Sequence, residues 1–291
     1  MNILKKLKKS NIRVTDIAAQ FWCEKQMELG YIYGHKITAE IKKGKDIHEV
    51  LENETNIPII LMPKNYADAL YKILYTSVLA IETLFENNKS REIQVYGAVD
   101  GFPLVGKVDM LELKDGAVIL LEDKTKATDT LPNTPQLYTH KIQIMFYKKM
   151  LDELIQKKYT KEDYKRQYNI DKLVISDEFK RQLDALNVKK EDQNLDSIVT
   201  KYFSMFPKLG KIDDMLKIRY INQFTGNEIK TYKFLYDKNE VDNTLKFILG
   251  YWKGEREALT VPESENWKCK YCGFYGKECT KWWPQKTLNN N

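Results

Sequence analysis

Three consecutive β-strand patterns place the strongest limit on how this chain can fold. Residues 91–99, 103–113 and 117–126 are rich in β-branched and apolar side chains, which favour extended structure. Asp100-Gly101 separates the first two segments and Lys114-Asp115-Gly116 separates the last two, and both sequences are typical of tight hairpin turns. The pattern predicts an antiparallel unit of three strands.

Helical patterns surround this strand unit and predict a mixed α/β fold. Before the strands, we expect helices at residues 16–29, with Thr15 as the N-cap, at 41–52 and at 65–87. After the strands, we expect a helix at 136–156, mostly helical sequence at 157–212, a hairpin around Thr225-Gly226-Asn227 and a helix at 238–253. We find no internal repeat and no low-complexity linker, so we expect one intertwined domain.

Composition indicates a soluble intracellular protein. A chain of 291 residues with 43% hydrophobic residues can bury a sizeable core. No apolar run approaches the roughly 18 residues that a membrane span requires, and the basic start of the sequence lacks the apolar segment of a secretory signal. We expect a monomer without membrane contact, and the sequence favours none of the cytoplasm, the nucleus and the mitochondrion.

The net charge of the chain is concentrated at its start. The formal net charge is +6, and the first thirteen residues supply five of these charges, which leaves 42 basic against 41 acidic residues in the rest. The body of the chain is therefore nearly neutral. An argument for nucleic-acid binding must rest on the arrangement of charges rather than on their total.

The sequence LLEDKTK at residues 120–126 places charges at the end of an apolar strand. A strand projects residues i and i+2 from one face, so Glu122 and Lys124 are expected side by side. The preceding hairpin strand brings Asp109 close to Glu122. Two converging carboxylates repel one another unless a cation such as Mg²⁺ or Mn²⁺ lies between them. With the metal in place, Lys124 can orient water and stabilise charge on a phosphate.

Three further residues add to this pattern, although each also has an ordinary structural interpretation. His48 lies in a predicted helix, where a neutral imidazole can bind metal or belong to the core. Gln143 and Tyr147 stand four residues apart on the next helix and share a face, but a solvated glutamine and a packed tyrosine are common. Gly106, three residues before Asp109, leaves room for a close approach of other groups.

Four cysteines predict a metal or cluster site. Cys269, Cys272 and Cys279 have the spacing C-x₂-C-x₆-C, and Cys23 lies in the first predicted helix. An intracellular location disfavours a disulfide framework. Four thiolates are enough for a closed tetrahedral site, and both Zn²⁺ and a [4Fe–4S] cluster fit such a set.

These motifs together resemble the RecB-like branch of the PD-(D/E)XK nuclease superfamily. The helix histidine is His48, the G-x-x-D strand is 106–109, the acid-x-Lys strand is 122–124 and the Q-x-x-x-Y helix is 143–147. The resemblance implies a restriction-endonuclease-like core, with a central mixed sheet flanked by helices and helical elaboration. It divides the single nuclease domain of residues 1–291 into a catalytic hairpin and helix at 91–156, a helical insertion at 157–212 and a cysteine segment at 267–283 that closes with Cys23.

Within this branch the chain is most similar to the exonuclease V family. The matching segments are VTDIAAQFWCE (14–24), GKVDM with EDKTKATDTLP, the QIMFY helix, DMLKIRYINQ (214–223) and YWKGERE followed by WKCKYCGFYGKEC (251–279). The resemblance implies a metal-dependent exonuclease of single-stranded DNA that acts in DNA repair or genome maintenance. It also favours [4Fe–4S] over Zn²⁺ at Cys23, Cys269, Cys272 and Cys279.

The resemblance also implies roles for individual residues. His48, Asp109, Glu122 and Asp123 would hold Mg²⁺ or Mn²⁺, Lys124 would position water, and Gln143 and Tyr147 would order the site. Lys126 and Tyr138 are candidates for DNA contact, although Lys126 stands where the family often has an arginine and lacks its bidentate fork. Single-stranded DNA is the expected partner, with a single-strand-binding protein as a candidate.

Two alternatives to this function remain open. One is a CRISPR-adaptation-type or endonucleolytic RecB-like nuclease on the same core. The other is a non-catalytic DNA-binding subunit with a structural cluster, which the presence of Asp109, Glu122 and Lys124 disfavours.

Overall fold

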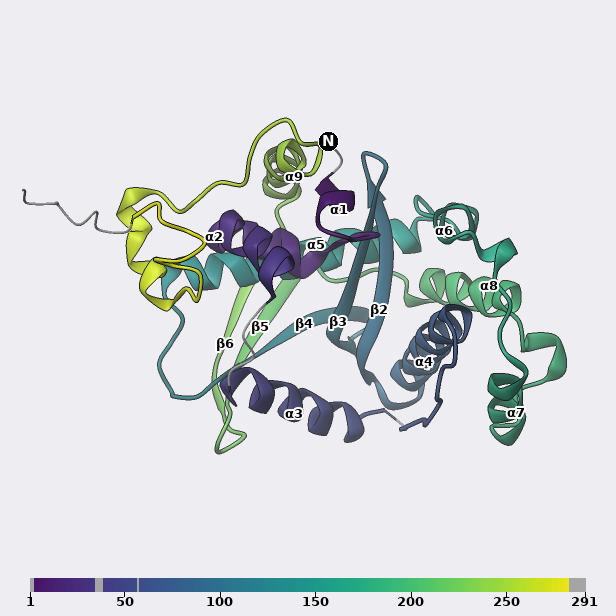
Figure 1. Cartoon of the computed structure of the whole chain (residues 1–291). Helices are drawn as coiled ribbons and strands as arrows, with labels where there is room; N and C mark the ends of the chain where they lie inside the picture. Colours follow the sequence, from purple (N-terminus) through teal and green to yellow (C-terminus); the bar gives the residue numbers. More distant parts are fainter. Residues whose placement is uncertain (1–2, 35–38, 57, 283–291) are drawn as a thin grey trace, which may run out of the picture.

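A six-stranded mixed sheet forms the frame of the computed structural model, which describes residues 3–34, 39–56 and 58–282 (Figure 1). Its strands are β1 (Ile12–Arg13), β2 (Lys89–Val99), β3 (Phe102–Lys114), β4 (Ala117–Lys126), β5 (Met215–Asn222) and β6 (Glu228–Leu235). The pairs β2–β3, β3–β4 and β5–β6 are antiparallel, whereas β1–β3 and β4–β5 are parallel. The predicted three-strand unit and the second hairpin are confirmed.

The β3–β4 hairpin divides partway along its length. The paired residues run from Lys114 and Ala117 to Met110 and Leu121. Beyond that point β4 continues alongside β5 up to Lys126, while β3 continues alongside β2 and takes β1 as a neighbour at Leu104. Figure 1 shows β4 turning away from β3. The division leaves space between two strands that began as neighbours.

Helices lie on both sides of the sheet, as the predicted α/β fold requires. The α-helices are α1 (Ile3–Lys6), α2 (Val14–Tyr33), α3 (Ala39–Asn53), α4 (Tyr66–Asn87), α5 (Thr134–Ile155), α6 (Lys161–Tyr168), α7 (Asp177–Ala185), α8 (Leu195–Met205) and α9 (Lys238–Trp252). Short 3₁₀ helices are η1 (Ile170–Lys172), η2 (Lys190–Asp192), η3 (Phe206–Leu209) and η4 (Glu263–Tyr271). In Figure 1, α5 and α2 lie together on one side of β4, and α3 lies on the other. The coarse fold is thus a central mixed sheet flanked by helices.

The predicted N-cap of the first long helix is wrong. Helix α2 begins at Val14 and Arg13 is its N-cap residue, so Thr15 already lies within the first turn. The Arg13 N–H donates to the Asp16 carboxylate at 2.8 Å. An acidic side chain in the first turn satisfies a backbone donor near the helix start, and this contact moves the helix start ahead of Thr15.

Buried polar contacts join α2 to the segment after α9. The Trp252 indole N–H donates to Gln20 Oε1 at 2.8 Å, and the Leu259 N–H donates to Glu24 Oε2 at 2.7 Å. Arg256 donates to the other oxygen of Glu24 at 3.0 Å. Because Gln20 and Glu24 are buried, each would be costly to leave unpaired. These contacts hold distant parts of the sequence together without help from the cysteines.

Within the described residues, no helix combines the length and the apolar composition that a membrane crossing needs.

Candidate active site

The division of the β3–β4 hairpin places two carboxylates at its fork. Asp109 directly precedes Met110 and Glu122 directly follows Leu121, and Met110 and Leu121 are the last pair of the hairpin. The Asp123 N–H, which lies at the start of the unpaired stretch, donates to Asp109 Oδ2 at 2.9 Å. The Asp109 side chain thus takes the place of a backbone partner. This bond and the shared electrostatics of Asp109 and Glu122 confirm that the hairpin brings the two residues together.

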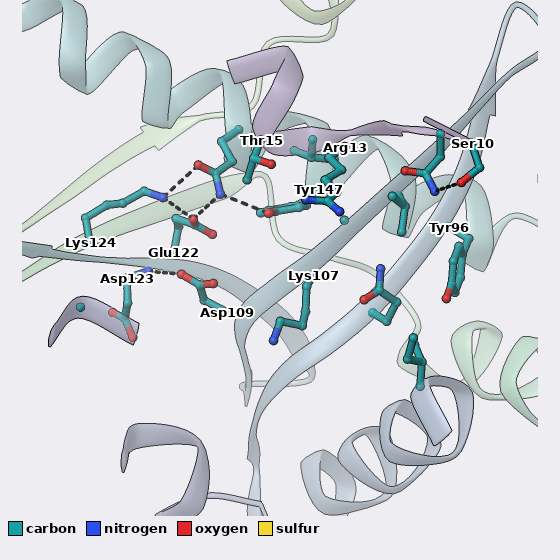
Figure 2. A pocket seen from close by; sticks show the side chains of 18 of the residues that line it. Ser10, Arg13, Thr15, Tyr96, Lys107, Asp109, Glu122, Asp123, Lys124 and Tyr147 are labelled. Atoms are coloured by element: carbon teal, nitrogen blue, oxygen red, sulfur yellow. Dashed lines mark hydrogen bonds and ion pairs between the residues drawn. The ribbon is translucent and has the colours of Figure 1, made fainter. Parts of the chain in front are cut away.

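Helix α5 holds the acid–lysine pair of β4 through Gln143. Lys124 Nζ donates to Glu122 Oε1 at 2.6 Å and to Gln143 Oε1 at 2.9 Å. Gln143 Nε2 donates to Glu122 Oε1 at 2.6 Å and to the Tyr147 hydroxyl at 3.1 Å. Figure 2 shows Lys124, Glu122 and Tyr147 converging on one side of β4. The predicted grouping of Glu122, Lys124, Gln143 and Tyr147 is therefore present in the structure.

Gly106 is the position that lets Tyr147 reach this group. A Cβ atom at residue 106 would lie 2.5 Å from Tyr147 Cε1 and 2.9 Å from Val14 Cγ2. Both distances are far inside van der Waals contact, and Tyr147 and Val14 are buried. The glycine of the G-x-x-D strand is therefore required by the packing of α5 and α2 on β3.

Glu122 carries an unsatisfied buried oxygen at the centre of the site. Its side chain is fully buried, and Oε2 has no hydrogen-bond partner among the described residues. Burial raises the pKa of Glu122 well above its usual range, and the nearby Asp109 raises it further. Burial lowers the pKa of Lys124, but the carboxylates of Glu122 and Asp109 outweigh this effect and leave that pKa raised.

The donors at the fork fit a hard divalent cation. An unpartnered carboxylate oxygen beside a second carboxylate offers the oxygen ligands that Mg²⁺ and Mn²⁺ take. No three His, Cys, Asp or Glu side chains of the described residues form a complete metal cluster. His48 lies in α3, but its side chain is outside the described residues. Asp109 and Glu122 are thus the two residues that would hold such a cation.

The Asp123 side chain, expected as a metal ligand, is held by two arginines in this structure. Asp123 points to the face of β4 opposite Glu122 and is buried. Its Oδ2 accepts from Arg91 at 2.7 Å and from Arg219 at 2.9 Å, and its Oδ1 accepts from Arg219 at 2.7 Å. These guanidinium groups lower the pKa of Asp123 although burial opposes them. Two cations already occupy both oxygens.

The two residues expected to contact DNA lie beside the site rather than in its cavity. A cavity of about 940 Å³ opens in front of Asp109, Glu122 and Lys124, and neither Lys126 nor Tyr138 lines it. Tyr138 is 37% exposed and its ring packs edge-on against Phe21 at 5.7 Å between centroids. Their role as DNA contacts stays a prediction without support from the cavity.

Sequence reasoning missed other residues that line this wide cavity. Arg13 lies at one side of the cavity in Figure 2, and Lys107, two residues before Asp109, also lines it. Tyr66, Tyr96 and Tyr168 line its other end. The i, i+2 spacing could have placed Lys107 with Asp109. The three tyrosines come from separate elements, so no local pattern links them.

The four cysteines line one small cavity between α2 and the C-terminal segment. Cys23 comes from α2, and the other three are Cys269, Cys272 and Cys279. Burial raises the pKa of the Cys23 thiol, and burial together with the other three cysteines raises that of Cys269. The cavity has no His, Asp or Glu among the described residues of its lining. Four sulfur donors match a zinc ion or an iron–sulfur cluster by ligand type, although the described residues do not bring three of these thiols to the spacing of a metal site.

Comparisons with known proteins agree with this arrangement. The model of the family described as "Exonuclease V - a 5' deoxyribonuclease" matches residues 1–117, 113–204 and 192–283. Exonuclease V of Danio rerio is 24% identical over 299 residues, covering 96% of this chain and 72% of that protein. The crystal structure of SSO0001 is 14% identical, covers 93% of this chain and 90% of its own, and has a TM-score of 0.42, too low to support an argument.

The family match defines a deoxyribonuclease that acts as an exonuclease. The chain belongs to the exonuclease V family, and the resemblance found in the sequence is confirmed.

Gly106→Ala tests the packing of Tyr147. The added methyl must displace the Tyr147 ring or Val14, which costs about 1–3 kcal/mol of unfolding free energy. A small displacement of the site lowers kcat by up to about 10²-fold. Gly97→Ala on neighbouring β2 is the control, because its methyl would meet Met150 at an ordinary 3.6 Å. Melting curves and single-turnover digestion measure both variants, and equal behaviour would contradict the packing argument.

Glu122→Gln tests the raised pKa of Glu122 in the metal-free protein. A raised folded-state pKa contributes stability at acidic pH that is lost as pH rises through that pKa. In EDTA, the melting temperature of the variant relative to the wild type should therefore increase from pH 5 to pH 8. Each 1 kcal/mol corresponds to roughly 2–4 °C in a chain of this size. A difference independent of pH would show that Glu122 ionises normally.

Proposed function

We propose that this chain is a metal-dependent exonuclease of single-stranded DNA. The observation that carries the proposal is the buried, unpartnered Oε2 of Glu122 beside Asp109 and Lys124. A buried carboxylate oxygen without a partner is costly unless a cation binds it. Family membership supports DNA as the substrate, and the site supports phosphodiester hydrolysis as the reaction.

Each residue at the fork has a distinct task in this proposal. Asp109 and Glu122 would hold the metal through their carboxylates. A bound Mg²⁺ or Mn²⁺ would polarise the phosphoryl group and lower the pKa of a bound water. Lys124 donates to the charge that develops on the phosphate. Gln143 fixes the positions of Lys124 and Glu122 through the contacts to both, and Tyr147 holds the Gln143 amide.

The wide cavity supports a single strand as the substrate. Arg13 at its side offers a guanidinium for phosphate contact. Tyr66, which is 55% exposed, offers a ring surface in the lining, and stacking of bases on aromatic rings is the common means of holding single strands. The family description supports digestion from 5' ends, and we propose that the protein acts in DNA repair or genome maintenance.

The cysteine cavity supports a structural cluster as a second part of the proposal. We infer a [4Fe–4S] cluster held by Cys23, Cys269, Cys272 and Cys279, with Zn²⁺ as the alternative. Lys268 is buried, and its Nζ lies 4.6 Å from the centre of the Trp22 ring beside the same cavity. Its ammonium also donates to Glu265 Oε2 at 2.5 Å, so Lys268 fixes the wall of the cavity at Trp22 rather than adding a free positive charge.

Digestion of linear and circular single strands tests the proposed function. Linear single-stranded DNA should be degraded in Mg²⁺ and left intact in EDTA, while blunt duplex and closed circular single strands resist. Asp109→Asn and Glu122→Gln should lose cleavage, and Lys124→Met should lower it by about 10²–10³-fold. Glu112→Gln, a β3 carboxylate outside the cavity, is the matched control.

The amide variants are preferred to alanine because the side-chain oxygen in Asp109→Asn can still accept the Asp123 N–H. Equal rates on linear and circular strands would instead indicate internal cleavage. Full activity of Asp109→Asn would contradict the proposal that Asp109 helps to bind a metal ion.

Metal analysis tests the cysteine site. Protein purified without oxygen should be brown and contain about four irons per chain, as one Cys₄-bound cluster requires. Cys279→Ser should lose the iron and melt at a lower temperature, since metal binding contributes to folding free energy. Colourless protein with stoichiometric zinc would show that the four cysteines bind zinc instead of a cluster. Protein with neither metal would contradict both assignments of the cysteine site.

A further inference from the structure

A second cavity lies on the other side of Lys124 from the wide cavity. It has a volume of about 330 Å³, which is within the range of small-ligand sites. Thr15, Lys124 and Gln143 line both cavities. Lys124, which binds the reacting phosphate in the proposed function, therefore lies between the wide cavity and the smaller one. A strand that crosses the site from the wide cavity leads into the smaller one.

Two helix faces build the smaller cavity. Helix α2 contributes Thr15, Ala18, Ala19 and Trp22, and helix α5 contributes Gln136, Thr139, His140 and Gln143. Both sets have the spacing i, i+3, i+4, i+7, so each lies on one face of its helix. Small alanines on the α2 face leave the space open between the two helices.

The chemistry of this lining suits a nucleotide. Lys124 is the one charged side chain among the described residues that line the cavity, and no carboxylate is there to repel a phosphate. Hydroxyl, amide and imidazole groups supply neutral donors and acceptors. Trp22 supplies an indole surface, and the ring is held from elsewhere by Trp267 at 5.8 Å and by Lys268 Nζ at 4.6 Å from its centre.

His140 is the most specific group in the lining. Its Nδ1 lies 2.7 Å from the Tyr220 hydroxyl, and no described residue bonds to its Nε2. Burial, Lys124 and Lys126 lower its pKa to about 2, so the ring stays neutral at working pH. A neutral imidazole anchored at one nitrogen keeps the other available for a ligand.

We propose that this cavity is a nucleotide subsite, in which His140 Nε2 hydrogen-bonds, and Trp22 contacts, the nucleotide beyond the scissile phosphate. The subsite rests on the proposed function, because the strand must pass Lys124 to reach it. His140 is here a binding residue. It extends the face that Gln143 and Tyr147 form on α5 by one turn toward the helix N-terminus.

Two substitutions of His140 separate this role from a structural one. A glutamine amide reaches the position of Nε2, whereas an asparagine amide reaches only that of Nδ1, which faces Tyr220. His140→Ala should raise KM for short single strands by about tenfold, as loss of one ligand hydrogen bond does, with kcat changed much less. His140→Gln should restore binding and His140→Asn should not.

A third variant tests whether the substrate enters the smaller cavity. Ala19→Leu fills the cavity without altering His140 and should also raise KM and shift the lengths of the products. Affinity for the same oligonucleotides is measured without cleavage by fluorescence anisotropy in the Asp109→Asn background. This binding assay keeps the subsite testable if no cleavage is found, because loss of the proposed function would leave the affinity differences in place.

Three results would overturn the subsite. Wild-type KM and affinity in both His140→Ala and Ala19→Leu would show that no nucleotide enters the cavity. Rescue by His140→Asn rather than by His140→Gln would show that only the Tyr220 contact matters. A lowered melting temperature that accounts for the whole loss in His140→Ala, with Ala19→Leu unaffected, would assign His140 to folding.

Discussion

The hydrogen bond from the Asp123 N–H to Asp109 Oδ2 is the contact on which the site depends. A hairpin that divides leaves backbone groups without ladder partners, and a buried donor without a partner is costly. Asp109 satisfies the donor at the fork with a carboxylate, so the residue that stabilises the division also stands at the proposed metal site. The Asp109 side chain thus has both a structural and a proposed catalytic role. A substitution that removes its carboxylate oxygen affects both the hydrogen bond to Asp123 and the proposed metal site.

The alternation of β4 explains why a buried strand can end in five polar residues. Glu122 and Lys124 project toward α5, and Asp123 projects to the opposite face, where Arg91 and Arg219 bind it. Removing one member of a buried ion pair costs about 3–5 kcal/mol, so Arg91 of β2 and Arg219 of β5 both tie β4 in place. Both oxygens of Asp123 are thus paired on one face of the strand, whereas Glu122 Oε2 on the other face has no partner among the described residues.

Local patterns were sufficient for much of the fold and for the centre of the site. Hairpin turns and the period of two predicted that Asp109, Glu122 and Lys124 meet, and the period of helices predicted that Gln143 and Tyr147 share a face. The partners of Asp123 were out of reach because Arg91 and Arg219 stand 32 and 96 residues away. Parallel pairing of β4 with β5 brings Arg219 there, and no sequence period reports which distant strands become neighbours. The start of α2 was predicted too late because Thr15 is itself a common N-cap residue type. In the structure the Asp16 carboxylate accepts from the Arg13 N–H, and the helix begins at Val14.

Helix α2 connects the proposed active site to the cysteine cavity. Val14 packs near Gly106 at its start, and Cys23 lies further along the same helix beside Trp22. Gln20 lies between Val14 and Cys23 on this helix and accepts from Trp252. Glu24 directly follows Cys23 and accepts from Arg256 and Leu259. Because these buried contacts are independent of the thiols, they hold α2 against the segment after α9 even without a cluster. The helix is kinked at Cys23, and the neighbouring Trp22 lines both the cysteine cavity and the smaller cavity beside Lys124.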